Sequence, residues 1–183
     1  MRLRRATEAH VVPLLALING YADRDMLLRR SEESLRGCLD DFWVAEEGGV
    51  VVGCGALTAL GPGLGEVRSL AVREDRSGRG IGRQIVERLL EEAADRELVE
   101  VLALTRRVPF FEALGFHVTR RERFLDKLMV DCKACPLNLC CDETAMVRTP
   151  PEKRNGFNAE NAESNGEGAE KDVNRMTKQS IPS

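Results

Sequence analysis

The sequence contains few aromatic residues, no long apolar run and no excess of one charge. Aromatic residues make up 4% of its 183 residues, with Trp43 and Tyr21 as the single Trp and the single Tyr. Single-stranded nucleic acids are bound by stacking bases on aromatic side chains, so this scarcity argues against such partners. The 27 Lys and Arg residues are balanced by 30 Asp and Glu residues, which argues against a general nucleic-acid binder. Without a run of about 18 apolar residues, the sequence predicts no membrane-spanning helix.

The N-terminal segment combines several arginines with an apolar stretch that ends near Ala22, as a signal peptide does. A signal peptide needs an uninterrupted apolar region, whereas Glu8, His10, Pro13 and Asn19 interrupt this one. We therefore expect a cytoplasmic protein.

The composition changes at Thr149, which divides the chain into two parts. Only seven of the 35 residues from 149 to 183 are apolar, and the segment begins with Pro150 and Pro151. A segment this polar cannot bury enough apolar surface to offset the entropy lost on ordering. The sequence therefore predicts a folded domain over residues 1–148 and a disordered polar tail over residues 149–183.

Strand and helix patterns alternate within the predicted domain. Ile81, Ile85, Leu89 and Ala93 recur at four-residue spacing in the segment 80–96, which predicts a helix with one apolar face. Similar patterns predict helices at 9–19, 31–39 and 109–115, and strands at 3–6, 42–46, 50–57, 66–72, 100–105, 127–132 and 143–148. The predicted fold class is α/β with a mixed sheet.

A glycine-rich segment joins the strand expected at 66–72 to the helix expected at 80–96. Gly78, Gly80 and Gly82 have no side chains that would keep a ligand from the main chain. The first N–H groups of a helix lack internal partners, so they favour an anion such as phosphate or pyrophosphate. A flexible turn with solvated arginines is the alternative interpretation. The spacing fits neither a P-loop nor a Rossmann turn.

Three separated segments, 67–72, 79–82 and 110–116, resemble the GNAT acetyltransferase superfamily. The resemblance covers residues 1 to about 148 and implies a mixed, mostly antiparallel central sheet flanked by helices. It also implies that the main chain after residue 69 binds the pantetheine arm of acetyl-CoA, and that the glycine turn binds its pyrophosphate. The residues implied in cofactor binding are Leu70, Ala71, Val72, Arg76, Ser77, Gly78, Arg79, Gly80, Ile81, Gly82 and Arg83. Ser77 stands where the family usually has Gln or Arg. Arg76, one residue earlier, is placed to compensate for this missing side chain.

Further segments resemble the short bacterial amino-acid N-acetyltransferases of the N-acetylglutamate synthase type. These segments are 28–31, 66–72, 104–106 and the stretch from Asp131 to Met146. The resemblance implies acetyl transfer to the α-amine of a free amino acid. It favours L-glutamate as the acceptor, as in the first step of arginine biosynthesis.

Acetyl transfer to an amine requires a base and a polarised thioester carbonyl. Glu66 is the candidate general base, acting through a water, because strand alternation places it on one face with Leu70 and Val72. Arg68 shares this face, so an ordinary ion pair is the alternative role of Glu66. A main-chain N–H near Leu70 is the candidate for polarising the thioester oxygen. Phe111 stands where many GNAT enzymes have a proton-donating tyrosine, and we expect it to pack.

A small amino-acid acceptor needs its carboxylates held, which arginine does with two parallel hydrogen bonds. The candidates for substrate binding are Arg30, Arg68 and Arg106, and the alternative for each is a solvated charge. The sequence leaves the oligomeric state open, with a homodimer as one alternative.

Four of the six cysteines lie within ten residues. Cys132 and Cys135 have the spacing at which two thiolates share a metal, and Cys141 is the candidate third ligand of a structural zinc. A fourth ligand is not evident, so a reduced thiol loop or a local disulfide remains an alternative.

Two other functions compete with amino-acid acetylation. One is an acetyl-CoA-binding sensor or interaction module without catalysis, which the missing tyrosine and Ser77 favour. The other is acetylation of a protein amine, which would need an open groove rather than converging arginines.

Overall fold

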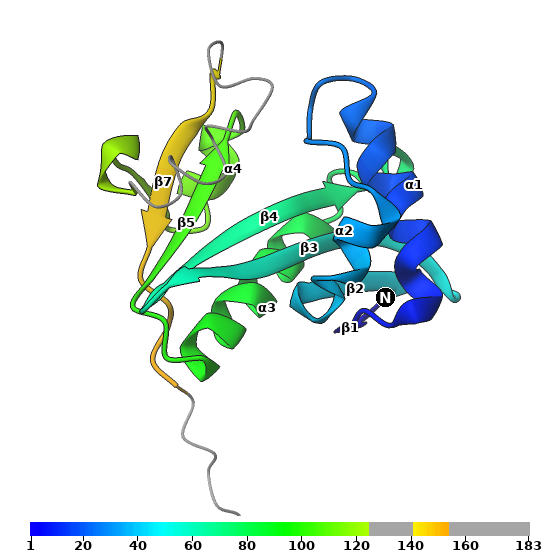
Figure 1. The fold of residues 1–183 in the computed structure, drawn as a ribbon, viewed down its shortest axis with the longest axis horizontal. Coiled ribbons are helices and arrows are strands. Elements are labelled where there is room, and N and C mark those ends of the chain that lie inside the picture. Colours follow the sequence, from blue (N-terminus) through cyan, green and yellow to red (C-terminus); the bar gives the residue numbers. More distant parts are fainter. Residues whose placement is uncertain (125–140, 154–183) are drawn as a thin grey trace, which may run out of the picture. The chain divides into compact units, whose positions relative to one another are not determined.

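A computed structural model describes residues 1–124 and 141–153 of the protein. Within these residues, seven strands form one sheet in the order β1-β2-β3-β4-β5-β7-β6 (Figure 1). Strands β4 and β5 are parallel and the other neighbouring pairs are antiparallel, which confirms the mixed, mostly antiparallel sheet. The strands are β1 (Arg2–Arg5), β2 (Phe42–Glu47), β3 (Val50–Gly61), β4 (Leu64–Val72), β5 (Glu100–Thr105), β6 (His117–Val118) and β7 (Thr144–Arg148). The helices are α1 (Val11–Ala22), α2 (Glu32–Arg36), α3 (Ile81–Asp95) and α4 (Val108–Glu112). The strand expected at 127–132 and the tail from residue 154 onward lie outside the described residues.

Helix α3 packs on one face of the sheet through the predicted apolar stripe. Ile81, Ile85 and Leu89 are at most 3% exposed. A glycine in β3 permits this close approach, because a Cβ atom on Gly55 would lie 2.8 Å from Cγ2 of Ile85. Among the described residues, no helix has both the length and the apolar character needed to cross a bilayer.

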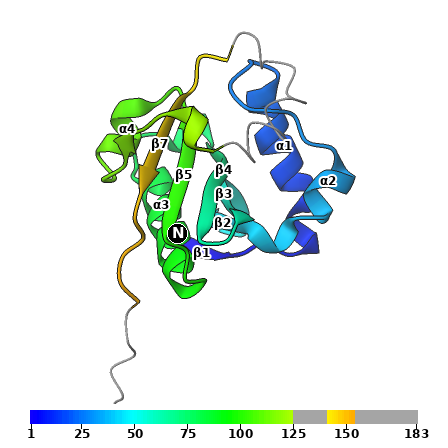
Figure 2. The same cartoon turned by 60° about the vertical axis from the view of Figure 1, so that its left-hand side comes forward.

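Helices α1 and α2 cover the opposite face of the sheet (Figure 2). Val11, Leu14 and Ile18 of α1 are fully buried against this face. Pro13 is tolerated because it is the third residue of α1, where its missing N–H has no intrahelical partner to lose. Helix α2 begins where its side-chain cap predicts, since the Ser31 hydroxyl accepts a hydrogen bond from the backbone N–H of Ser34 at 3.1 Å.

Strands β4 and β5 pair only along their first halves. Their register runs from Leu64 opposite Glu100 to Val67 opposite Ala103. Both strands continue further, β4 to residue 72 and β5 to residue 105, and there they diverge (Figures 1 and 2). The sheet therefore opens between two strands that are paired at their base.

A buried carboxylate ties α3 to the first two strands. Glu92 is 2% exposed and lies 2.9 Å from Nη2 of Arg5, and it also pairs with Arg96. The indole N–H of Trp43 donates to its other oxygen. The guanidinium groups of Arg5 and Arg88 lie 5.1 and 4.2 Å from the centroid of the Trp43 ring. One carboxylate thus holds two arginines and the single tryptophan.

We predict that Glu92→Ala lowers the free energy of unfolding by about 2–4 kcal/mol. The change leaves the indole N–H without a partner and removes the counter-charge of two arginines. Chemical denaturation measures this loss. Glu87→Ala is the matched control on the same helix, because Glu87 is 50% exposed and its pair with Arg83 spans 3.6 Å. The control should lose no more than about 0.5 kcal/mol, and an equal loss in both variants would contradict a special role for Glu92.

Candidate functional site

The diverging parts of β4 and β5 enclose a cleft of about 870 Å³. One wall is β4 from residue 66 to 72, and the facing wall is the end of β5 at 104–107. The glycine-rich turn with the start of α3 lines one part of the cleft, and the loop between α1 and α2 lines another. A cleft of this size is typical of a small-molecule site.

This cleft brings together most of the predicted site residues, which come from four parts of the chain. They are Arg30, Glu66, Arg68, Leu70, Ala71, Val72, Arg76, Ser77, Gly78, Gly80, Ile81, Gly82, Arg83 and Arg106. Arg79 is the exception, since it is exposed and is not among the lining residues. It lies between Gly78 and Gly80, which both line the cleft.

The glycine-rich turn has the backbone that an anion site requires. Gly78 and Gly80 have φ angles of 76° and 77°, in the left-handed region that favours glycine. Gly80 is the residue that caps α3, and no side chain of the described residues accepts from the first-turn amides. The N–H groups at this helix end therefore remain available for a ligand.

The arginines beside the turn are partly neutralised. Nε of Arg76 lies 2.9 Å from a Glu47 oxygen, and its Nη1 lies 2.8 Å from Asp75. Arg83 donates to the Ala113 carbonyl at 3.3 Å. The main chain therefore offers the more open contacts to an anion.

The upper part of β4 exposes its backbone to the cleft. The N–H of Arg73 donates to the Val52 carbonyl at 2.9 Å, so Arg73 bonds toward β3. Bonded and non-bonded residues alternate in an antiparallel ladder, so the N–H and C=O of Val72 point away from β3. The Tyr21 hydroxyl, at the end of α1, donates to this carbonyl. Burial and the negative charge of Glu74 raise the pKa of Tyr21, which keeps the hydroxyl protonated as a donor.

A bulge in β4 corrects the expectation that Glu66, Leu70 and Val72 share one face. Ser69 has a φ angle of 49°, and the register with β3 shifts beside it. The extra residue reverses the alternation. Leu70 and Val72 consequently pack on the α3 side of the sheet. Arg68 and Glu66 lie on the other side, because each is paired with a β3 residue that faces α1.

Glu66 is a buried carboxylate in the cleft, with 3% exposure. It forms an ion pair with Nε of Arg68, whose side chain is 22% exposed. The ion pair predicted as the alternative role of Glu66 is therefore present. The Glu66 side chain also belongs to the lining of the cleft.

Arg30 enters the cleft from the loop between α1 and α2. Its Nε donates to the Ser69 hydroxyl at 3.0 Å, and its Nη1 contacts the sulfur of Cys38 at 3.5 Å. The side-chain amide of Asn19 fixes its backbone through two hydrogen bonds of 3.0 Å. Among the described residues, Arg30 has no acidic partner.

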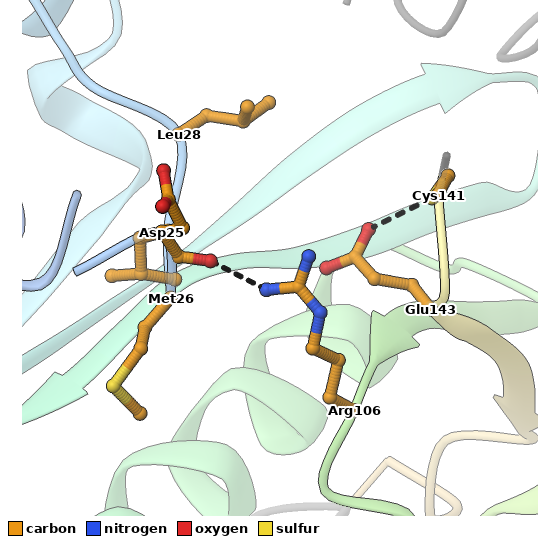
Figure 3. Close-up of a pocket in the computed structure, with 7 residues that line it drawn as sticks. Asp25, Met26, Leu28, Arg106, Cys141 and Glu143 are labelled. Atoms are coloured by element: carbon orange, nitrogen blue, oxygen red, sulfur yellow. Dashed lines mark hydrogen bonds between the residues drawn. The ribbon is translucent and has the colours of Figure 1, made fainter. Parts of the chain in front are cut away.

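Arg106 bridges two segments at one end of the cleft (Figure 3). Its Nη1 donates to the Asp25 carbonyl at 2.6 Å, and its Nε pairs with Asp142. The hydrogen bond between Arg106 and Asp142 holds the pKa of the Asp142 carboxyl below its usual value and raises the pKa of Arg106. Met26 and Leu28 lie nearby, so apolar side chains border this charged contact.

Of the predicted zinc ligands, Cys132 and Cys135 lie outside the described residues. The Cys141 thiol contacts a Glu143 oxygen at 3.8 Å (Figure 3). Residues 1–124 and 141–153 contain no group of three side chains that could hold a metal ion.

Sequence reasoning missed two features of the cleft. The contact between Tyr21 and Val72 joins residues 51 positions apart, and no local pattern indicates it. Arg107 lines the cleft and makes no ion pair with any other described residue, although its place beside Arg106 at a strand end could have indicated it. The packing role expected for Phe111 is confirmed, because it is buried with ring contacts of 5.1 Å to Phe110 and Phe116.

The fold and the cleft define an α/β protein with a ligand site at an open sheet and an uncapped helix N-terminus. Residues 39–118 match the acetyltransferase (GNAT) domain family. An uncharacterized N-acetyltransferase, CT2212, of Chlorobaculum tepidum is 37% identical over 147 residues, or 80% of this chain and 95% of the relative. An amino-acid acetyltransferase of Mycobacterium tuberculosis is 42% identical over 117 residues, or 62% of this chain and 67% of the relative. The chain therefore belongs to the GNAT acetyltransferase family.

Two solved structures share the fold. Rv2747 from Mycobacterium tuberculosis, in complex with CoA and NLQ, has a TM-score of 0.73 and 32% identity, over 81% of this chain and 99% of that one. N-acetylglutamate synthase from Neisseria gonorrhoeae, complexed with coenzyme A and N-acetyl-glutamate, has a TM-score of 0.76 and 22% identity. That match covers 82% of this chain and 35% of the synthase, and it shows the fold alone.

We predict that Cys54, which contacts the bulge, resists alkylation in the folded protein. The side chain is fully buried, and burial raises its pKa to about 12, so only about one thiol in ten thousand is ionised at pH 8. Iodoacetamide labelling at pH 8, read by peptide mass spectrometry, should modify the partly exposed Cys38 at least about tenfold faster. Both residues should react in guanidinium. Equal labelling of the two thiols in the folded protein would show that β3 opens at this site.

Proposed function

We propose that this protein transfers the acetyl group of acetyl-CoA to the α-amine of a free amino acid. The proposed acceptor is L-glutamate, which would make the reaction the first step of arginine biosynthesis. The observation that carries the proposal is a single cleft that holds a helix N-terminus without a side-chain cap, an unpaired strand edge and a buried carboxylate. The amino-acid acetyltransferase among the relatives and the structure of Rv2747 with bound CoA support it.

The residues present fit a coenzyme A thioester at two places. The amides at the start of α3, at Ile81 and Gly82, have no side-chain cap among the described residues and suit the diphosphate. The N–H of Val72 points away from β3 and suits an amide of the pantetheine arm. When bound, acetyl-CoA supplies the activated acetyl group, and this chain supplies its orientation.

The chemistry requires a neutral amine and a polarised thioester. In our proposal, Glu66 takes the proton of the acceptor ammonium through a water. An N–H near Leu70 polarises the carbonyl oxygen of the thioester. The new C–N bond forms as the C–S bond breaks, and the sulfur leaves as a thiolate that takes up the second proton lost by the nitrogen. A thiol is acidic enough to leave without a dedicated acid, which accounts for Phe111 at the family's tyrosine position.

We assign the acceptor's carboxylates to Arg68 and Arg106. Arg68 lies on the side of β4 that carries Glu66, and Arg106 directly follows β5. Arg68 is engaged by Glu66 and Arg106 by Asp142, so an acceptor carboxylate would displace or share these contacts. A guanidinium can do this because it presents five donors.

One observation favours a second candidate, an acetyl-CoA-binding sensor without catalysis. Glu66 is held by Arg68, and the helix with Phe111 offers no hydroxyl at that position. Such a protein would retain the cofactor contacts and transfer nothing.

The first experiment is an acceptor panel with the full chain. We expect thiol release from acetyl-CoA with L-glutamate, and about tenfold lower kcat/KM with acceptors that lack a second carboxylate, because one charge-assisted contact is lost. L-glutamine, other amino acids and lysine-containing peptides complete the panel. Binding of acetyl-CoA without release would identify the sensor. Release with peptides alone would indicate protein acetylation and overturn the proposal.

The cofactor site is tested by a pair of glycines with equal backbone strain. Gly80 caps α3 with a φ angle of 77°, and Gly49, in the β2–β3 turn, has one of 79°. Alanine at either position should cost about 1–2 kcal/mol of stability. Calorimetry should show about tenfold weaker acetyl-CoA binding for Gly80→Ala alone, because only that turn aims amides at the ligand. Unchanged binding by Gly80→Ala would remove the helix end from the cofactor site.

A further inference from the structure

The bulge at Ser69 is held by groups from two other elements. Ser69 has a positive φ angle of 49°, which is costly for a residue with a side chain. Its hydroxyl accepts from Nε of Arg30 at 3.0 Å, and its carbonyl accepts from the thiol of Cys54 at 3.4 Å. Both the side chain and the main chain of this residue are therefore fixed.

The contact with Cys54 determines where the next N–H points. A trans peptide is planar, so the carbonyl of Ser69 and the N–H of Leu70 point in opposite directions. Because that carbonyl is directed at the Cys54 thiol, the Leu70 N–H is directed away from it. Leu70 lines the cleft.

The contact with Arg30 comes from the loop between α1 and α2, which also lines the cleft. The backbone of Arg30 is tied to the end of α1 through both amide atoms of Asn19, each at 3.0 Å. Its guanidinium also lies 5.6 Å from the centroid of the Phe42 ring. The donor at Ser69 is therefore pre-positioned, and the loop between α1 and α2 is fastened to β4 at the bulge.

We propose that Arg30 is a positioning residue: through the Ser69 hydroxyl, together with Cys54, it aims the Leu70 N–H at the thioester oxygen. This role differs from direct binding of an acceptor carboxylate, which was expected for Arg30 from the sequence. It rests on the proposed function for the identity of the reacting group.

A double-mutant cycle tests this role. Ser69→Ala removes the hydroxyl and retains the Cβ atom, and Arg30→Met removes the guanidinium. We expect each change to lower kcat about tenfold, less than the hundredfold or more lost when an oxyanion donor is deleted. The double variant should also lose about tenfold, because both changes break one hydrogen bond. Thermal unfolding of each variant establishes that it is folded.

Three further variants complete the test. Cys54→Ala should lower kcat, and Cys54→Ser should restore it because the hydroxyl again donates to the Ser69 carbonyl. Arg36→Met removes an arginine of α2 that is 45% exposed and pairs with Glu32 at 2.8 Å. It lies outside the cleft lining, so kcat and both KM values should stay at the wild-type level.

Two results would contradict the positioning role of Arg30. If Arg30→Met raises the acceptor KM at unchanged kcat while Ser69→Ala behaves as wild type, Arg30 is an acceptor ligand and the proposal is wrong. A hundredfold loss in the double variant would mean that the two residues act independently.

A measurement without turnover separates this proposal from the proposed function. The NMR amide signal of Leu70 should shift when acetyl-CoA is added to the wild type, and both single variants should diminish that shift. An unaltered response in both variants overturns the positioning role, whatever the acceptor panel shows. A wild type that responds at Leu70 but acetylates no acceptor counts against the proposed function alone.

Discussion

The separation of β4 from β5 after Val67 is the constraint on which the site depends. A continuous sheet would pair the backbone of both strands along their full length and leave no main-chain groups for a ligand. Here the pairing stops at Val67 opposite Ala103, and the upper part of β4 turns its peptide groups toward the cleft. Helix α1 approaches this unpaired edge of β4, where the Tyr21 hydroxyl donates a hydrogen bond to the Val72 carbonyl. The same divergence places the glycine turn and the end of β5 around one space.

The charges in this space are arranged in two groups. Near the glycine turn, Arg76 is occupied by carboxylates, so the helix amides and the left-handed glycines provide the open anion contacts. In the rest of the cleft, Arg68 of β4 is paired with Glu66. Arg30, from the loop between α1 and α2, and Arg107, which follows β5, make no ion pair with any described residue. A ligand with a diphosphate at one end and a zwitterion at the other would meet complementary groups at both. This distribution suits a reaction that joins a nucleotide-bearing donor to an amino acid.

The local features of the fold could be predicted from the sequence, and the long-range ones could not. The stripe from Ile81 to Ala93, the Ser31 cap and the glycine turn each depend on neighbours within a few residues. The bulge at Ser69 has no such signal, because serine is not a residue that marks a left-handed conformation. The prediction from regular strand alternation, that Glu66 and Leu70 share one face, is therefore wrong. The contacts of Arg106 with Asp25 and Asp142 depend on how separate loops meet, and a count of arginines could not reveal them.

The choice of serine at the bulge follows from the same contacts. Glycine at position 69 would adopt the positive φ angle of 49° without strain, which for serine amounts to about 1–3 kcal/mol. Glycine would also remove the hydroxyl that receives Arg30, and a hydrogen bond from a charged group contributes about 1.5–3 kcal/mol. The strain and the contact are therefore of similar size. Serine at position 69 therefore gains little stability over glycine. Its presence is most simply explained by the orientation of the peptide group that it fixes. That peptide group carries the Leu70 N–H, which it holds in a fixed orientation beside the cleft.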